Sequence, residues 1–138
     1  MQKNSTDEIV SLFFSASRAL KRKLDSASPI FQLPTAQVEI LRLIAEKKQI
    51  LMKEAADFLS ITPPSATVLV NKLVSLDLVE RSSDKNDRRT VCLTLTEKGS
   101  KAMDKAILER CRTFKKLLSK LSGKQQSQFL NILKRMSN

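Results

Sequence analysis

The sequence predicts a mainly α-helical fold with one small β-hairpin. Six stretches carry apolar residues at spacings of three and four, which is the period of a helix, and two short β-prone runs flank a polar connection. The expected order is helix, helix, short strand, helix, helix, strand, strand, helix, helix. A chain of 138 residues has room for a single domain, which we assign to residues 1–138.

The N-terminal part predicts two helices separated by a loop. The first runs from Thr6 to about Leu24 and places its apolar side chains on one face, with cations gathered near its end. The proline-containing segment Asp25–Pro34 predicts a loop. With Thr35 as N-cap, a second helix continues through Glu46, and residues 50–52 predict a strand fragment.

The central part predicts two helices joined by a tight turn. The first of them covers residues 53–59, and residues 60–62 form the turn. Thr62 followed by Pro63 is a strong start for the next helix. The Thr62 hydroxyl can accept from a backbone amide of the first turn, and Pro63 has no N–H that would need an acceptor there. That helix ends near Leu76. Its inward face is Ala66, Leu69, Val70 and Leu73. Such a pair predicts a helix-turn-helix, whose second helix enters the major groove of DNA.

Two β-prone runs, residues 78–82 and 91–95, flank a charged connection and predict a hairpin with a long tip, which completes a winged helix-turn-helix. Thr96 then caps a long helix with a coiled-coil-like apolar stripe. The stripe consists of Met103, Ile107, Cys111, Phe114, Leu118 and Leu121. Ser122 begins the last helix.

The outer face of the second helix of the pair holds no acidic residue, which suits a groove lined with phosphates. Its candidate DNA-binding residues are Pro64, Ser65, Thr67, Val68, Asn71 and Lys72. Hydroxyls bond to bases or phosphates, Val68 can pack on a thymine methyl group, and Asn71 can make two bonds to adenine. The alternative is an ordinary solvated helix face.

The hairpin tip supplies the second set of candidates. We expect Arg88 and Arg89 to reach into a narrow minor groove, where the negative potential is strongest, with Lys85 also on DNA and Asp87 orienting Arg89. The alternative is a polar turn that is charged only for solubility.

The net charge of +11 points toward a polyanion, but its distribution qualifies that conclusion. Residues 35–95, which hold the DNA-binding candidates, carry nine Lys or Arg against eight Asp or Glu. Residues 96–138 carry eleven against three. The affinity of the winged segment for DNA must therefore depend on where its few cations stand.

The composition argues against catalysis and metal binding. There is no histidine, the two glycines form no phosphate loop, and Cys92 and Cys111 fit neither a zinc site nor a disulfide framework. We therefore expect no enzyme, no cofactor and no metal. A polar N-terminus and the lack of a long apolar stretch predict a cytoplasmic protein.

Several motifs in fixed order resemble the MarR family of bacterial regulators. They are Leu33-Pro34-Thr35-Ala36-Gln37, residues 53–62, Leu76-Asp77-Leu78-Val79-Glu80-Arg81, and Asp87-Arg88-Arg89 followed by Leu95-Thr96-Glu97-Lys98-Gly99. Ser60 and Asp77 stand where the family usually has glycine, and Pro34 departs from the usual Leu-Thr pair.

The resemblance implies a homodimer on a pseudo-palindromic operator. It makes Arg89 the arginine that enters the minor groove, residues 1–34 and 96–138 the dimerisation helices, and residues 35–95 the DNA-binding lobe. It also implies a pocket for a small lipophilic effector, for which Arg18 and Arg42 are the polar candidates. The first helix has no cysteine, so peroxide sensing is not supported.

Two functions remain open at this point. One is a sequence-specific regulator of transcription, acting as a repressor. The other is an architectural or nonspecific nucleic-acid-binding protein that uses its C-terminal cations.

Overall fold

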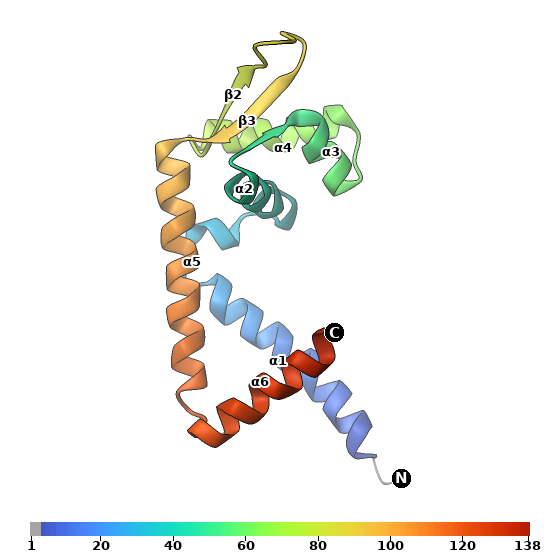
Figure 1. Cartoon of the computed structure of the whole chain (residues 1–138), viewed down its shortest axis with the longest axis vertical. Coiled ribbons are helices and arrows are strands. Elements are labelled where there is room, and N and C mark those ends of the chain that lie inside the picture. The colour runs from blue at the N-terminus through green and yellow to red at the C-terminus, as the bar shows by residue number, and fades with distance from the viewer. Residues whose placement is uncertain (1–3) are drawn as a thin grey trace. The chain divides into compact units, whose positions relative to one another are not determined.

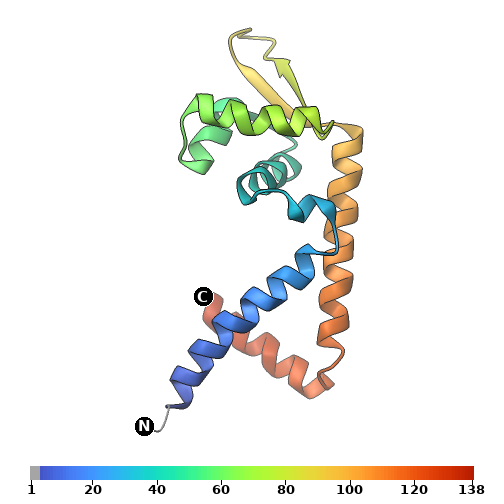
Figure 2. The same ribbon diagram turned by 180° about the vertical axis from the view of Figure 1, so that it is seen from behind.

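The computed structural model describes residues 4–138 and divides the chain into two compact units. The first unit comprises the chain up to Ala27 together with Leu108–Asn138, and the second is Ser28–Ile107. Residues 1–3 of the predicted dimerisation region lie outside the described part. The elements are labelled in Figure 1 and seen from behind in Figure 2.

The observed order of elements follows the predicted one. The helices are α1 (Ser5–Asp25), η1 (Pro29–Gln32), α2 (Thr35–Lys47), α3 (Met52–Leu59), α4 (Pro63–Ser75), α5 (Glu97–Leu118) and α6 (Gly123–Ser137). The strands are β1 (Gln49–Leu51), β2 (Val79–Ser83) and β3 (Val91–Leu95). The mainly helical fold with a small antiparallel sheet is thus confirmed.

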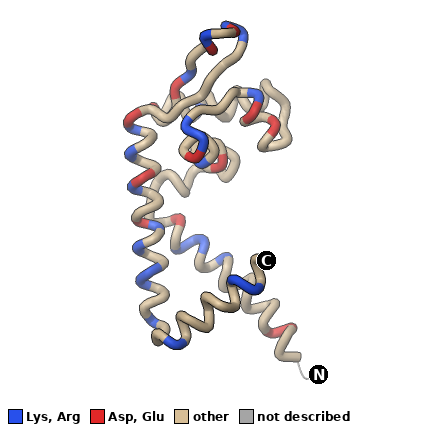
Figure 3. The backbone as a smooth tube through the Cα atoms, in the orientation of Figure 1, with Lys and Arg blue, Asp and Glu red and all other residues tan. Residues whose placement is uncertain are grey.

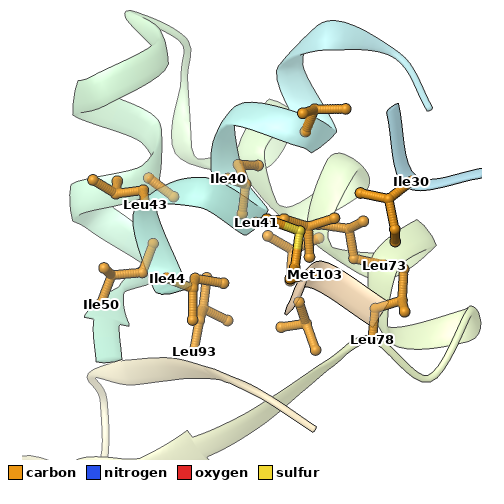
Figure 4. Close-up of a cluster of buried hydrophobic side chains, with 14 of the residues drawn as sticks. Ile30, Ile40, Leu41, Leu43, Ile44, Ile50, Leu73, Leu78, Leu93 and Met103 are labelled. Atoms are coloured by element: carbon orange, nitrogen blue, oxygen red, sulfur yellow. The ribbon is translucent and has the colours of Figure 1, made fainter. Parts of the chain in front are cut away.

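The sheet of the second unit has the strand order β1-β3-β2, and both pairs are antiparallel. Leu93 in the central strand faces Ile50 on one side and Arg81 on the other. Leu93 packs into a core with side chains from the helices (Figure 4). Its fully buried members include Ile40, Leu41, Ile44, Leu73 and Met103. This core fixes α4 and the hairpin in one rigid unit.

Three local predictions are wrong. Segment Asp25–Pro34 is not only a loop, because it contains η1, whose Ile30 and Phe31 are buried. Thr35 is not the N-cap of α2: Pro34 holds that position, and its carbonyl accepts from the amides of two residues in the first turn. Met52 opens α3 rather than ending a strand.

The turns after α3 and α4 both need a residue in the left-handed conformation. Ser60 (φ 54°) and Asp77 (φ 59°) supply it at the two positions where glycine is usual in the resembling family. After α4, the Leu78 amide donates to the Leu73 carbonyl and the Asp77 amide to the Val74 carbonyl, which together form a Schellman turn. At Ser60 and Asp77 the left-handed backbone brings the Cβ atom close to the following carbonyl oxygen, which strains the conformation.

Replacing Ser60 with glycine is therefore expected to raise the free energy of unfolding by about 0.5–1 kcal/mol, because the Cβ strain is removed. The matched control is Ser75→Gly, at the end of α4, where φ is not positive. That substitution should destabilise the protein by a similar amount. Urea denaturation of both variants checks the opposite signs, and equal destabilisation by both would contradict the strain argument.

The start of α5 is attached to the turn that follows α4. The Thr96 side chain caps the helix by accepting from the Gly99 amide (2.9 Å), as predicted, and its hydroxyl donates to the Asp77 carbonyl. The Thr96 amide donates to the Leu78 carbonyl at 3.0 Å. Gly99 lies so close to the backbone of Leu78 that a Cβ added at Gly99 would stand 2.0 Å from the Leu78 carbonyl oxygen.

The first unit differs from the second in having little core of its own. No residue of α1 or α6 that the structure describes is buried, although α6 begins with a complete capping box between Ser122 and Gln125. The predicted apolar face of α1 is exposed, and in the α5 stripe only Met103 is buried. Over residues 4–138 we find no helix that is both long and apolar enough to cross a membrane.

Candidate nucleic-acid interface

Helix α4 exposes the face that the sequence assigns to DNA. Ala66, Val70 and Leu73 are buried as predicted, whereas Leu69 is only half-buried. On the other side Pro64, Ser65, Val68, Asn71 and Lys72 are exposed and Thr67 is half-buried. Val68 keeps 67% of its surface exposed and so places an apolar side chain among the polar groups of this face.

Hydrogen bonds shape the N-terminal end of α4. The Thr62 side chain accepts from the Ser65 amide at 3.4 Å and shares a hydrogen bond with the Ser65 hydroxyl at 2.9 Å. The Thr67 hydroxyl donates to the Pro63 carbonyl at 3.0 Å. Both hydroxyls can also accept from an incoming group. The positive end of the helix dipole adds a preference for phosphate at this end.

Arg81 contacts a candidate residue of the interface, and the sequence analysis did not single it out. Its guanidinium donates from Nη2 to the Asn71 side-chain carbonyl, so that a residue of strand β2 holds a residue of helix α4. Asn71 was predicted to make two bonds to adenine, which require its carbonyl as an acceptor. In the free protein that carbonyl already has a donor. The Leu-Val-Glu-Arg motif contained the only signal, a cation at the base of the wing.

The wing tip is held by its own aspartates. Asp84 Oδ1 accepts from the Asn86 amide (3.1 Å), and Asp87 Oδ1 accepts from the Arg89 amide (2.9 Å). The Asp87 carbonyl also accepts from Thr90. Asp87 thus orients the Arg89 main chain, in an Asx-turn, while the guanidinium stays exposed.

The cations of this surface are free to meet an anion. Lys72, Lys85, Arg88 and Arg89 are exposed, and none forms an ion pair with any residue between 4 and 138. Helix α4 and the β2–β3 hairpin belong to the same unit, and α4 contacts strand β2. The connection between β2 and β3, which carries Lys85, Arg88 and Arg89, lies at the end of the hairpin that projects away from α4 (Figures 1 and 2).

The other sequence candidates are less distinctive. Arg42 lies 5.9 Å from the ring centre of Phe31 and 3.9 Å from the Glu39 carboxylate, so its guanidinium is engaged in local packing. Arg18 is exposed on α1. Cys92 is buried and Cys111 is exposed, and both are free thiols. Within the described residues no group of three His, Cys, Asp or Glu is placed to hold a metal ion.

A helix-turn-helix with an exposed second helix and a basic hairpin beside it defines a winged helix-turn-helix DNA-binding protein. Residues 31–90 match the model of the MarR family. The chain is thus similar to this family over its DNA-binding unit, and it is a winged helix-turn-helix, DNA-binding transcriptional regulator.

Known relatives agree with this assignment. The chain is 28% identical over 116 residues to YwhA of Bacillus subtilis, an uncharacterized HTH-type transcriptional regulator, with 84% of each chain covered. The fold is similar to that of YusO from Bacillus subtilis (TM-score 0.82, 18% identity, 98% of each chain). It also resembles a mutant of S. aureus MepR bound to an oligodeoxyribonucleotide (TM-score 0.75, 24% identity, 92% of this chain and 94% of that one).

Proposed function

We propose that this protein is a homodimeric repressor that binds a pseudo-palindromic operator. Helix α4 of each copy reads a major groove through Pro64, Ser65, Thr67, Val68, Asn71 and Lys72. The wing contacts the minor groove through Lys85, Arg88 and Arg89, with Asp87 ordering the tip. A dimer seated on such an operator occupies DNA that RNA polymerase needs, and repression follows from that exclusion.

One observation carries the DNA-reading part of the proposal. The face of α4 opposite the core holds no acid and exposes Val68 in a row of small polar residues. In the same unit, Arg88 and Arg89 of the wing have no ion-pair partner within residues 4–138. A single exposed valine is ordinary on a solvated helix, so its weight here comes from its acid-free and polar surroundings. In a major groove, thymine methyl groups offer such a side chain an apolar contact.

The homodimer part rests on the first unit. Its helices expose a large set of apolar side chains: Ile9, Val10, Leu12, Phe13, Phe14, Leu108, Phe129, Leu130, Ile132, Leu133 and Met136. A groove between α5 and α6 is lined by Phe114, Leu118, Phe129, Leu130 and Leu133 among others. Exposed apolar patches of this kind mark interaction sites. A second copy offers the matching surface under two-fold symmetry.

A charge placed on that surface should separate the dimer. Leu12 is 63% exposed on the apolar face of α1, and burying a carboxylate there without a partner is costly. Leu12→Glu is expected to weaken self-association at least about 100-fold. Ser11→Glu is the matched control, since helical spacing puts Ser11 on the opposite face. Sedimentation velocity measures both, and an unchanged Leu12→Glu dimer would contradict this interface.

Sequence selection from random duplex DNA tests the proposed function. The purified chain should enrich an inverted repeat whose half-sites are centred about 10 base pairs apart, or a multiple of that, because each half-site meets one α4. A selection that ends with no preferred sequence would contradict it. That result would favour the alternative, a nonspecific nucleic-acid-binding protein.

We extend the proposal to control by a small lipophilic ligand, on the family resemblance alone. Such a ligand would act by preferring one separation of the two DNA-binding units over another. Repeating the selection with added phenolic compounds tests this extension, and unchanged enrichment with every compound would remove it.

A further inference from the structure

The segment from Arg110 to Asn138 carries eight cations and no acidic residue. The rest of the chain holds 17 Lys or Arg and 14 Asp or Glu, which is nearly balanced. In Figure 3 this segment, the second half of α5 and all of α6, shows blue stretches and no red. The excess positive charge of the protein is therefore concentrated in the first unit, whereas the residues assigned to operator reading belong to the second.

Three cations of α5 form an accessible array, which we call the α5 basic surface: Arg112, Lys115 and Lys116. All three are exposed, and none has an ion-pair partner among the described residues. Their neighbour Arg110 differs, because it is half-buried and lies 3.6 Å from the Asp25 carboxylate. The array is thus left unneutralised by the protein itself.

Ordinary helix chemistry accounts for only part of this array. Lys115 and Lys116 lie in the last turn of α5, where cations favour the helix dipole. Arg112 lies before that turn, and its spacing of four from Lys116 sets two like charges side by side, which destabilises a helix. A bound polyanion would relieve that repulsion.

We propose that the α5 basic surface binds the phosphate backbone of DNA as a second contact, separate from the operator contact and independent of sequence. The inference rests on the DNA-binding function proposed above. DNA is the polyanion favoured here because the winged unit is the part of the chain that binds it, and a first contact raises the local concentration of DNA at any other surface that the duplex reaches. Lysines and arginines that neutralise phosphates release counterions, so the contact must weaken steeply with salt.

Binding to a 40-base-pair duplex of random sequence, measured between 50 and 200 mM salt, tests the proposal. The variant R112Q/K115Q/K116Q should lower the slope of log affinity against log salt by about 2.7, since each phosphate contact contributes about 0.9. Over that fourfold change in salt the wild type then loses about 40-fold more affinity than the variant. The control K47Q/K48Q/K101Q removes the same charge from exposed positions of the second unit and should leave the slope nearly unchanged.

Equal slopes for the two triple variants would overturn the inference, because net charge alone would then explain the effect. The inference would also be overturned if R112Q/K115Q/K116Q lost binding to phosphatidylglycerol vesicles but bound DNA like the wild type. That result would assign the α5 basic surface to a lipid membrane. Two further measurements show which DNA the surface binds. If an immobilised protein–operator complex captures a second labelled duplex, the surface binds a separate DNA molecule. If the triple variant loses more affinity for 40-base-pair than for 15-base-pair duplexes, the surface binds DNA that flanks the operator; either result supports the contact.

The two proposals fail in different ways. If Arg89→Ala leaves every affinity unchanged while R112Q/K115Q/K116Q weakens binding to all duplexes, operator reading is wrong and the second contact stands. If R112Q/K115Q/K116Q behaves like its control while Arg89→Ala weakens binding to the operator much more than to a scrambled duplex, the operator reading stands and the second contact is wrong.

Discussion

Replacing Gly99 with alanine is expected to destabilise the protein by about 3 kcal/mol, which corresponds to a fall in Tm of roughly 10 °C. The added Cβ would meet the Leu78 carbonyl oxygen at 2.0 Å. That oxygen cannot move away cheaply, because it accepts the Thr96 amide at 3.0 Å and belongs to the chain leading into β2. Relief requires shifting the start of α5 against the turn after α4.

Gly123→Ala is the matched control for this prediction. Gly123 opens α6, and nothing lies within 4 Å of a Cβ built there. Alanine should be neutral or slightly stabilising at that position because it restricts the unfolded chain. Differential scanning calorimetry of the two variants compares them directly. A Gly99→Ala protein that melts within about 2 °C of the wild type would show that the close approach costs little.

Arg89→Ala is expected to cause the largest loss of operator affinity, about 100-fold or more. A hydrogen bond made by a charged group contributes about 1.5–3 kcal/mol, and a dimer loses it in both half-sites at once. The Asx-turn of Asp87 should persist, because it holds the Arg89 amide rather than the side chain. The tip therefore keeps its shape and loses only the guanidinium.

Fluorescence anisotropy on a selected operator and on a scrambled duplex measures this loss. Lys101→Ala removes one exposed charge elsewhere in the same unit and serves as the control. The scrambled duplex should lose much less affinity than the operator. An equal loss on both duplexes would make Arg89 an unspecific phosphate contact and would contradict a role in reading the minor groove.

Local chemistry made much of the fold predictable from sequence. Thr62, Thr96 and Ser122 each cap a helix as expected, because an N-cap hydroxyl needs only the amides of the next turn. Ser60 and Asp77 stand where the family that the sequence resembles usually has glycine, and the structure gives both of them a positive φ. The outer face of α4 followed from helical spacing once its buried face was known.

Long-range contacts were not predictable in the same way. Helix η1 forms because Ile30 and Phe31 enter a core made by distant elements, whereas the prolines and serines of the segment Asp25–Pro34 predict a loop. The bond from Arg81 to Asn71 depends on β2 lying against α4, and no periodicity in the sequence encodes it. The apolar face of α1 follows from helical spacing, but a single copy of the chain leaves it exposed, and only the proposed dimer would cover it.

Hydroxyl-radical footprinting on the selected operator tests the central claim, that a dimer reads DNA through α4 and the wing of each copy. For the wild-type protein we predict a two-fold symmetric pattern of protection. Arg89→Ala is measured at a protein concentration high enough to saturate the operator. In that variant the minor-groove protection assigned to each wing should disappear. The protection near α4 should remain. Uniform protection without symmetry, or an unchanged pattern for Arg89→Ala, would contradict the account.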